Sequence, residues 1–196
     1  LNIKDKFGGT KLYYAARYPI VLKTLLELLP EKDRLEAVKI NNFSEQAILH
    51  HAIGKPGVLK IIIDLLPEQD RLNAVMMRDS VGRTLLYRAA FDPESFKILM
   101  ALLPEQDRLE AVKIKDNSGE TLLHCATRHP ESLKTILALL PEEALIDKEV
   151  QAFAEKCHIS LAGRFNSAHE NGSVAAQAFK QQVKEMKDPE PPESPA

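Results

Sequence analysis

The stretch Leu102-Leu-Pro-Glu-Gln-Asp-Arg-Leu-Glu-Ala-Val112 occurs twice more in the chain with small changes, at residues 28–38 and 65–75. A Leu-Leu-Pro sequence recurs four times, and its prolines are spaced by 37 residues: Pro30, Pro67, Pro104 and Pro141. Self-similarity at a fixed period of this length is typical of repeat architectures, in which each copy buries its apolar face against its neighbours. The chain is therefore predicted to be a repeat protein.

Composition narrows the function classes. The 196 residues are 44% hydrophobic, which is enough to bury a core. The formal charge of −2 provides no large positive field for phosphates, so nucleic acid is not expected as a partner. No apolar run approaches the roughly 20 residues of a membrane helix, so membrane insertion is not expected either. Two cysteines, Cys125 and Cys157, cannot form a disulfide framework, which favours a reducing, cytoplasmic compartment.

Each copy begins with a turn and a short helix. The fourth copy reads Asp116-Asn-Ser-Gly119-Glu-Thr121-Leu-Leu-His124-Cys-Ala126. Aspartate followed by a glycine that accepts positive φ is typical of a turn, and threonine is a preferred helix N-cap. The first and third copies keep both features, whereas the second has Glu45 and Ala47 at these positions. We therefore expect the second copy to have the least well capped helix.

A second, longer helix is predicted after a further proline in every copy: Pro19, Pro56, Pro93 and Pro130. Proline suits the first turn of a helix, where its missing N–H is not needed. Four apolar residues then follow at the i, i+3, i+4, i+7 spacing of one buried stripe, in the first copy Leu22, Leu25, Leu26 and Leu29. The proline and acidic residues of the opening stretch predict a third, short helical turn.

The motif Gly-x-Thr-x-Leu-His-x-Ala, followed by two helices, resembles the ankyrin repeat, whose pattern is Asp-x-x-Gly-x-Thr-Pro-Leu-His-x-Ala-Ala. The resemblance covers four copies at about 5–41, 42–78, 79–115 and 116–141. The copies depart from the family by lacking the proline after threonine and by running to 37 residues rather than about 33. Tyrosine also alternates with histidine at the family's histidine position.

The resemblance implies an all-α, ankyrin-like helical repeat solenoid with short turn or hairpin fingers and a concave face that grips partner proteins. It also implies that His124 forms hydrogen bonds between neighbouring turns. Long copies of this kind are similar to those in effector proteins that intracellular bacteria inject into host cells. A bacterial effector would be secreted into the host cell cytosol.

The repeat fades after Pro141, and residues 142–187 are predicted to form a helical C-terminal cap. One helical stripe from Ile146 to Leu161 is expected to continue to about residue 164, and a second helix is expected over 175–186. Residues 188–196 hold four prolines, which predicts a disordered tail or linker, or else a proline-rich ligand. Leu1 falls in register with Val38, so the chain is expected to be a fragment with more copies or another domain upstream.

Histidine and cysteine side chains are the only candidates for metal binding or nucleophilic chemistry. Cys125 and His129 are four residues apart and would share one face of a helix. No closed metal-ligand spacing such as Cys-x-x-Cys accompanies them, and Cys125 is interpreted as a packing residue. We therefore predict no catalytic residues, no metal, no cofactor and no enzymatic activity.

Charged residues also follow the period. A lysine series contains Lys23 and Lys60, and an arginine series consists of Arg34, Arg71 and Arg108. A basic stripe is one interpretation of these series. Acidic residues follow the same period and cancel the long-range electrostatic field of the basic residues. A mixed-charge, solvated surface is therefore favoured.

Positions that differ between copies are the candidates for partner binding, because packing has not dictated them. They fall at the turn tips and near the end of the first helix, and they include aromatic and arginine side chains, which dominate binding hot spots. The alternative for Phe43 and Phe91 is that each packs against a neighbouring copy. The candidate partner-binding residues are Tyr14, Arg17, Tyr18, Phe43, Gln46, Lys55, Arg83, Arg88, Phe91, Asp92, Glu120, Arg128 and His129.

The predicted function is recognition of a partner protein, of unknown identity, by a monomeric ankyrin-like array. One alternative is that the repeats are the targeting portion of a larger enzyme whose catalytic domain lies outside this chain or within 142–187. Another is a purely structural, self-associating scaffold.

Overall fold

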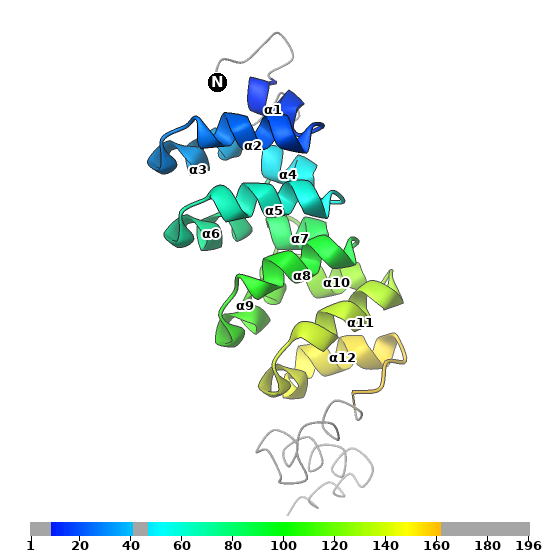
Figure 1. Cartoon of the computed structure of the whole chain (residues 1–196). Coiled ribbons are helices and arrows are strands. Elements are labelled where there is room, and N and C mark those ends of the chain that lie inside the picture. The colour runs from blue at the N-terminus through cyan, green and yellow to red at the C-terminus, as the bar shows by residue number, and fades with distance from the viewer. Residues whose placement is uncertain (1–8, 41–46, 162–196) are drawn as a thin grey trace, which may run out of the picture.

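The computed structural model describes residues 9–40 and 47–161, which form an all-α structure (Figure 1). The first helix of each copy is short: α1 (Lys11–Ala15), α4 (Ile48–Ala52), α7 (Leu85–Ala89) and α10 (Leu122–Ala126). The second helices are α2 (Pro19–Glu27), α5 (Pro56–Leu65), α8 (Pro93–Ala101) and α11 (Pro130–Leu139). The third helices are α3 (Glu31–Lys39), α6 (Glu68–Val75) and α9 (Arg108–Lys113), the last preceded by a 3-10 turn, η1 (Glu105–Asp107). A 3-10 turn, η2 (Glu142–Ile146), and α12 (Lys148–Lys156) follow.

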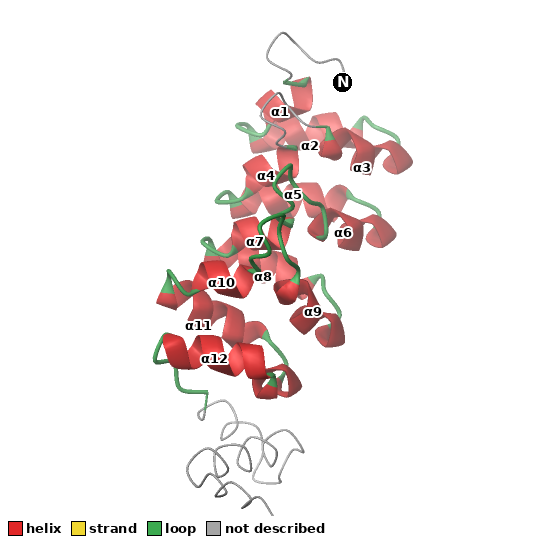
Figure 2. Ribbon diagram, turned by 180° about the vertical axis from the view of Figure 1, so that it is seen from behind, coloured by secondary structure: helices red, strands yellow, loops and turns green. Residues whose placement is uncertain are grey.

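The helices succeed one another in layers along the molecule. Each second helix contacts the second helix of the next copy, in the order α2, α5, α8 and α11, and each first helix packs against the second helix of its own copy. Both views show α3, α6 and α9 along one edge of the molecule (Figures 1 and 2). Among the described residues, no helix has the length and apolar character needed to cross a bilayer.

Threonine caps the short first helices as predicted. The hydroxyls of Thr10, Thr84 and Thr121 each accept a hydrogen bond from the backbone N–H three residues later, at 3.2, 3.1 and 3.3 Å. Ala47 occupies the same position before α4 and forms no side-chain cap. The prediction that the second copy has the least well capped first helix is confirmed. The predicted proline also stands at the start of each second helix.

The apolar stripes of the second helices form the core. The four predicted residues are buried in each of the last three copies, for example Leu59, Ile62, Ile63 and Leu66. In the first copy Leu25 and Leu29 are only partly buried. No preceding layer among the described residues covers α2, and Val21 is accordingly 49% exposed whereas the equivalent Val58 is 5% exposed.

The turns before α7 and α10 contact each other directly. The backbone N–H of Asn117 donates to the carbonyl of Val81 at 3.0 Å, and the Arg78 guanidinium donates to the carbonyl of Lys115 at 2.8 Å. Gly82 has φ of +79°, and a Cβ on it would lie 2.9 Å from the backbone nitrogen of Asn117. Glycine is therefore needed there both for the turn and for the close approach of the next turn.

The C-terminal helix is shorter than predicted. The stripe was expected to continue to about residue 164, but α12 ends at Lys156. His158 adopts a left-handed φ of 55°, and the N–H groups of His158 and Ile159 donate to the carbonyls of Glu155 and Ala154 at 2.9 and 2.8 Å. This Schellman arrangement satisfies the last carbonyls and stops the helix. The second helix expected over 175–186 and the tail at 188–196 lie outside the described residues.

Candidate partner-binding surface

Three predicted aromatic residues are substantially exposed near the ends of the first helices. Tyr14 is 43%, Tyr18 64% and Phe91 47% exposed. Large aromatic side chains at such exposure do not contribute fully to a core and remain available for contact. Phe43 and Gln46 lie outside the described residues.

Aromatic rings also link neighbouring copies on this surface. Phe91 meets His129 of the next copy edge to face, with ring centroids 4.7 Å apart. Tyr13 and His51, from the first and second copies, have centroids 5.0 Å apart. The sequence left open whether Phe91 packs against a neighbouring copy or is exposed for binding. In the structure it contacts the neighbouring copy and still exposes about half of its surface.

Arg88 is engaged within the fold, and not only at its surface. Its Nε donates to the Oδ2 of Asp79 at 2.7 Å, and the Asp79 side chain is 2% exposed. The other carboxylate oxygen of Asp79 accepts from the N–H groups of Val81 and Arg83. Arg88 thus fixes the turn before α7, and its replacement would disturb the turn as well as any binding surface.

Arg83 has a similar structural contact. Its Nε donates to the Oδ2 of Asp116 in the next turn at 3.3 Å, and its guanidinium lies 5.0 Å from the centre of the Tyr87 ring. This arrangement ties the third copy to the fourth through an ion pair and a cation–π contact. The main contacts of Arg83 and Arg88 are therefore with the aspartates of the turns.

Four further candidates, Asp92, Glu120, Arg128 and Lys55, have intramolecular polar contacts. The Asp92 carboxylate accepts from the N–H of Ser95 at 3.0 Å and caps α8. Arg128 donates to Glu120 at 3.3 Å. Lys55 donates to the Nε2 of His51 at 3.0 Å, and burial, followed by the charges of Lys55 and Arg17, lowers the pKa of His51. His51 is thereby held as a neutral acceptor at neutral pH.

Apart from Arg83 and Arg88, which pair with the aspartates of the turns, the described candidates with an exposed or partly exposed aromatic or cationic group near the first helices form the first-helix surface. Its members are Tyr14, Arg17, Tyr18, Lys55, Phe91, Arg128 and His129.

The side chains of Asp79 and Asp116, each 2% exposed, accept hydrogen bonds within the turns in their charged form. The hydroxyl and backbone N–H of Ser118, with the N–H of Glu120 and the Arg83 side chain, lower the pKa of Asp116 to about 2. Burial alone would raise the pKa of Asp79, but hydrogen bonds from the backbone of Arg83 and the side chain of Arg88 outweigh it, so this pKa is also lowered. The carboxylates act as acceptors for the backbone of their own turns.

The two carboxylates predict that the free energy of unfolding falls in acid. Because the pKa values of Asp79 and Asp116 are lower in the folded chain, their stabilisation is complete above the ordinary aspartate pKa, about 3.9. It is lost as the pH falls from about 4 towards about 2. Urea unfolding at several pH values should show this decline, and Asp116→Asn should flatten it. An equally steep decline in Asp116→Asn would exclude Asp116 as its source.

The histidine expected from the ankyrin resemblance behaves differently in this chain. His124 Nδ1 lies 2.7 Å from the hydroxyl of Thr121 and 3.3 Å from its N–H, so the ring completes a capping box within its own turn. Neither ring nitrogen of His50 has a hydrogen-bond partner among the described residues, and burial lowers the pKa of His50. The expected hydrogen bonds of His124 to neighbouring turns do not occur among the described contacts.

The Cys125 thiol and the His129 ring share no hydrogen bond in the described part of the chain, and the His129 ring meets Phe91 instead. Both cysteines are free thiols, and the thiol of Cys157 lies 3.5 Å from the carbonyl oxygen of Thr127. Residues 9–40 and 47–161 contain no group of three or more His, Cys, Asp or Glu side chains placed to hold a metal ion.

The periodic arginines have a role that the sequence analysis missed. Arg34 donates to the carbonyls of Leu26 and Leu29 in its own copy, at 3.1 and 3.3 Å, and to Leu65 of the next copy at 2.9 Å. Arg108 likewise donates to Leu139 of the next copy at 3.2 Å. The prediction of a solvated surface is wrong for these arginines, which bind the carbonyls at the ends of the second helices.

A signal for this role was present in the sequence. The three copies keep arginine at this position, whereas the neighbouring basic residue Lys32 becomes glutamine in the others. Arginine carries several donors in a fixed fork, which suits two or three carbonyls at once. In the fourth copy the equivalent position is the buried Leu145, and α12 follows in place of a further copy.

No protein-family model matches the chain, and no curated protein is similar enough to count as a match.

Proposed function

We propose that the chain is an ankyrin-like repeat solenoid that recognises a partner protein through the first-helix surface. The observation that carries the proposal is the exposure of Tyr14, Tyr18 and Phe91 at positions that differ between the copies. Neighbouring positions of the same helices, such as Leu86 and Ala89, are fully buried. The variable side chains thus keep a large exposed surface beside helix positions that the core encloses fully.

The ordered arrangement of the helices supports the solenoid part of this proposal. The same three helices recur in four consecutive copies, except that a 3-10 turn replaces the third helix in the last. The second helices contact their successors in sequence order, and the arginines bind carbonyls across two of the boundaries between copies. Nearest-neighbour contacts of this kind are the stabilising pattern of repeat proteins.

The chemistry of the surface suits recognition of a protein. Aromatic rings and cationic side chains lie together, with Phe91 against His129 and Arg128 one residue before it. Aromatic residues and arginine are the side chains most often found at binding hot spots. An exposed ring supplies apolar area, and a nearby cation supplies direction for an acidic or carbonyl group on the partner.

The test compares the parent chain with a Phe91→Ala/His129→Ala double variant. Affinity capture from cell lysate identifies proteins retained by the parent, and titration of the purified partner then measures affinity. We expect the double variant to lose about 30-fold or more in affinity, because truncation of one hot-spot residue costs about 2 kcal/mol. Arg88 is left intact because it holds Asp79.

The matched control is Leu28→Ala, since Leu28 is 72% exposed at the end of α2 and does not belong to the first-helix surface. It should bind the partner as the parent does. Full binding by the double variant, with unchanged circular dichroism, would show that recognition does not use this surface.

A further inference from the structure

Two grooves formed by described residues lie along the edge of the third helices. One of them, with a volume of about 300 Å³, lies between α6 and α9. Leu72 lines it from α6, Met76 from the position directly after α6, and Ile114 from the position directly after α9. The carboxylates of Asp107 and Glu110 stand on its α9 side. This groove therefore combines apolar walls with an acidic border.

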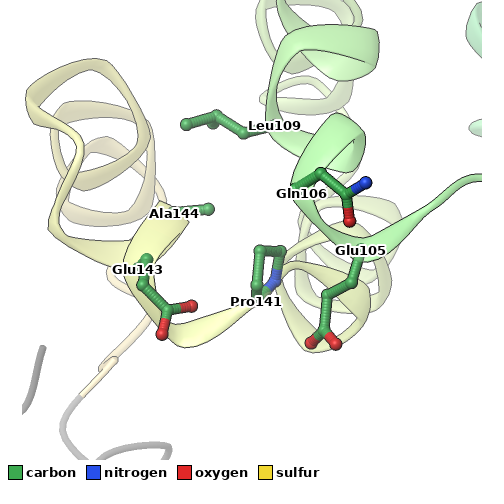
Figure 3. A pocket seen from close by; sticks show the side chains of 6 residues that line it. All are labelled: Glu105, Gln106, Leu109, Pro141, Glu143 and Ala144. Atoms are coloured by element: carbon green, nitrogen blue, oxygen red, sulfur yellow. The ribbon is translucent and has the colours of Figure 1, made fainter. Parts of the chain in front are cut away.

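The second groove, of about 460 Å³, lies one copy further along, between the η1–α9 segment and η2. Leu109, Pro141 and Ala144 provide its apolar lining, and Glu105 and Glu143 stand at its border (Figure 3). Both volumes are within the range of about 300–1,000 Å³ that is usual for binding pockets.

The grooves occupy equivalent places in consecutive copies. Leu72, in the first groove, and Leu109, in the second, are the same position of the repeat, 37 residues apart. Leu72 is 40% exposed, while the equivalent Leu35 of the first copy is 7% exposed. The sequence keeps leucine in all three copies, but only the later copies leave it open within a groove.

The lining of both grooves is acidic, with no lysine, arginine or histidine among the described residues that form it. The nearby Lys113 is occupied by Asp147 and Glu149, at 3.0 and 3.7 Å. Several of the acids stand in the first turns of helices, where the helix dipole favours them. Charge complementarity nevertheless requires a cationic occupant, because a second acidic segment would be repelled.

We propose that the two grooves together bind an amphipathic, basic helix of a partner protein. The second helices of neighbouring copies pack against each other, which spaces the copies by the roughly 8–10 Å that is usual for packed helices, and two turns of an α-helix advance about 11 Å. Two apolar side chains two turns apart on the incoming helix therefore reach the two grooves, and lysine or arginine beside them meets the acidic borders. This surface lies on the third helices and does not depend on the first-helix surface.

The probe for this proposal is a synthetic helical peptide, rich in lysine and alanine, with two leucines two turns apart. Fluorescence anisotropy measures its binding to the full chain. We expect binding that weakens with added salt and that falls by more than about tenfold in a Glu110→Lys/Glu143→Lys variant, which reverses one charge in each groove. A matched peptide with glutamate in place of lysine should bind this variant better than it binds the parent, and this reciprocal gain excludes unfolding as the cause.

Two further comparisons complete the test. The peptide with both leucines changed to alanine should bind more weakly, and equal binding would overturn the apolar part of the proposal. The Phe91→Ala/His129→Ala chain should bind the peptide as the parent does, so failure of the first-helix surface and failure of the grooves are distinguishable.

One outcome would assign the grooves to a different occupant. Residues 174–187, which lie outside the described part of the chain, contain Phe179 and Met186 two turns apart in sequence, with Lys180 and Lys184 between them. If the peptide bound only after Lys180→Glu/Lys184→Glu, the chain's own segment would compete for the grooves, and the partner proposal would be wrong. Unchanged binding in the Glu110→Lys/Glu143→Lys variant would overturn the proposal altogether.

Discussion

Replacing Arg34 with alanine is expected to lower the free energy of unfolding by about 3 kcal/mol. The guanidinium donates to the carbonyls of Leu26, Leu29 and Leu65 at 3.1, 3.3 and 2.9 Å, and the first two lie at the C-terminal end of the second helix. Without the side chain these carbonyls lose a charged donor in a partly buried place. A hydrogen bond to a charged group contributes about 1.5–3 kcal/mol, and the partial exposure of Arg34 argues against summing all three.

The measurement is urea unfolding of Arg34→Ala beside Lys32→Ala, an exposed position on the same helix, which should change stability by less than about 0.5 kcal/mol. Arg34→Lys should recover little, because an ammonium group cannot reproduce the fork of donors. Arg71→Ala should cost less than Arg34→Ala, since the carbonyls to which Arg71 donates, Leu66 and Asp64, are both in its own copy. Equal losses for the two alanine variants would contradict a stabilising role for the contact between copies.

The features that the sequence predicted well are local ones. Threonine caps, prolines at the start of the second helices and the apolar stripes each depend on residues within one or two helical turns. The capping bonds from Tyr13 and Tyr87 to Thr10 and Thr84 span three residues, so periodicity and capping preferences are sufficient to place them. The all-α class followed from the same patterns.

The features that the sequence did not predict depend on contacts between copies or on competition for one side chain. Arg83 pairs with Asp116, 33 residues away, and Arg34 reaches Leu65, 31 residues away. A pattern within one copy does not show which neighbour such a side chain meets. Arg88 was assigned to partner binding because the residue at its position differs between the copies. Only the third copy has arginine there, and this arginine forms an ion pair with Asp79.

The end of α12 shows a second reason why a feature could not be predicted from the sequence. Cys157 and Leu161 continue the apolar spacing of the helix, and Leu161 is buried, yet the helix stops before both. A buried residue needs to reach the core but need not be helical. His158 adopts the left-handed conformation that glycine usually supplies, so the usual sequence signal for a helix stop is missing.

The stability of the interior should depend most strongly on Phe96, the largest fully buried side chain among the described residues. Phe96 lies on α8 and is 1% exposed, and α8 packs between α5 and α11. Phe96→Ala removes the apolar contacts of the ring and leaves a cavity that the surrounding helices cannot fully close. The expected loss in the free energy of unfolding is about 3–5 kcal/mol.

Phe91→Ala is the matched comparison, because it makes the same chemical change five residues earlier in the same copy. Phe91 is 47% exposed, so its truncation removes less buried apolar area, and its edge-to-face contact with His129 adds about 1 kcal/mol. The loss should therefore be clearly smaller than that of Phe96→Ala. Urea unfolding of both variants, followed by circular dichroism, measures the two losses. A large loss in Phe91→Ala would mean that the ring acts in packing between copies, and the surface proposed for partner recognition would then lose its central aromatic residue. A small loss of stability in Phe91→Ala, together with weakened partner binding, would show that Phe96 stabilises the fold whereas Phe91 contributes to partner recognition.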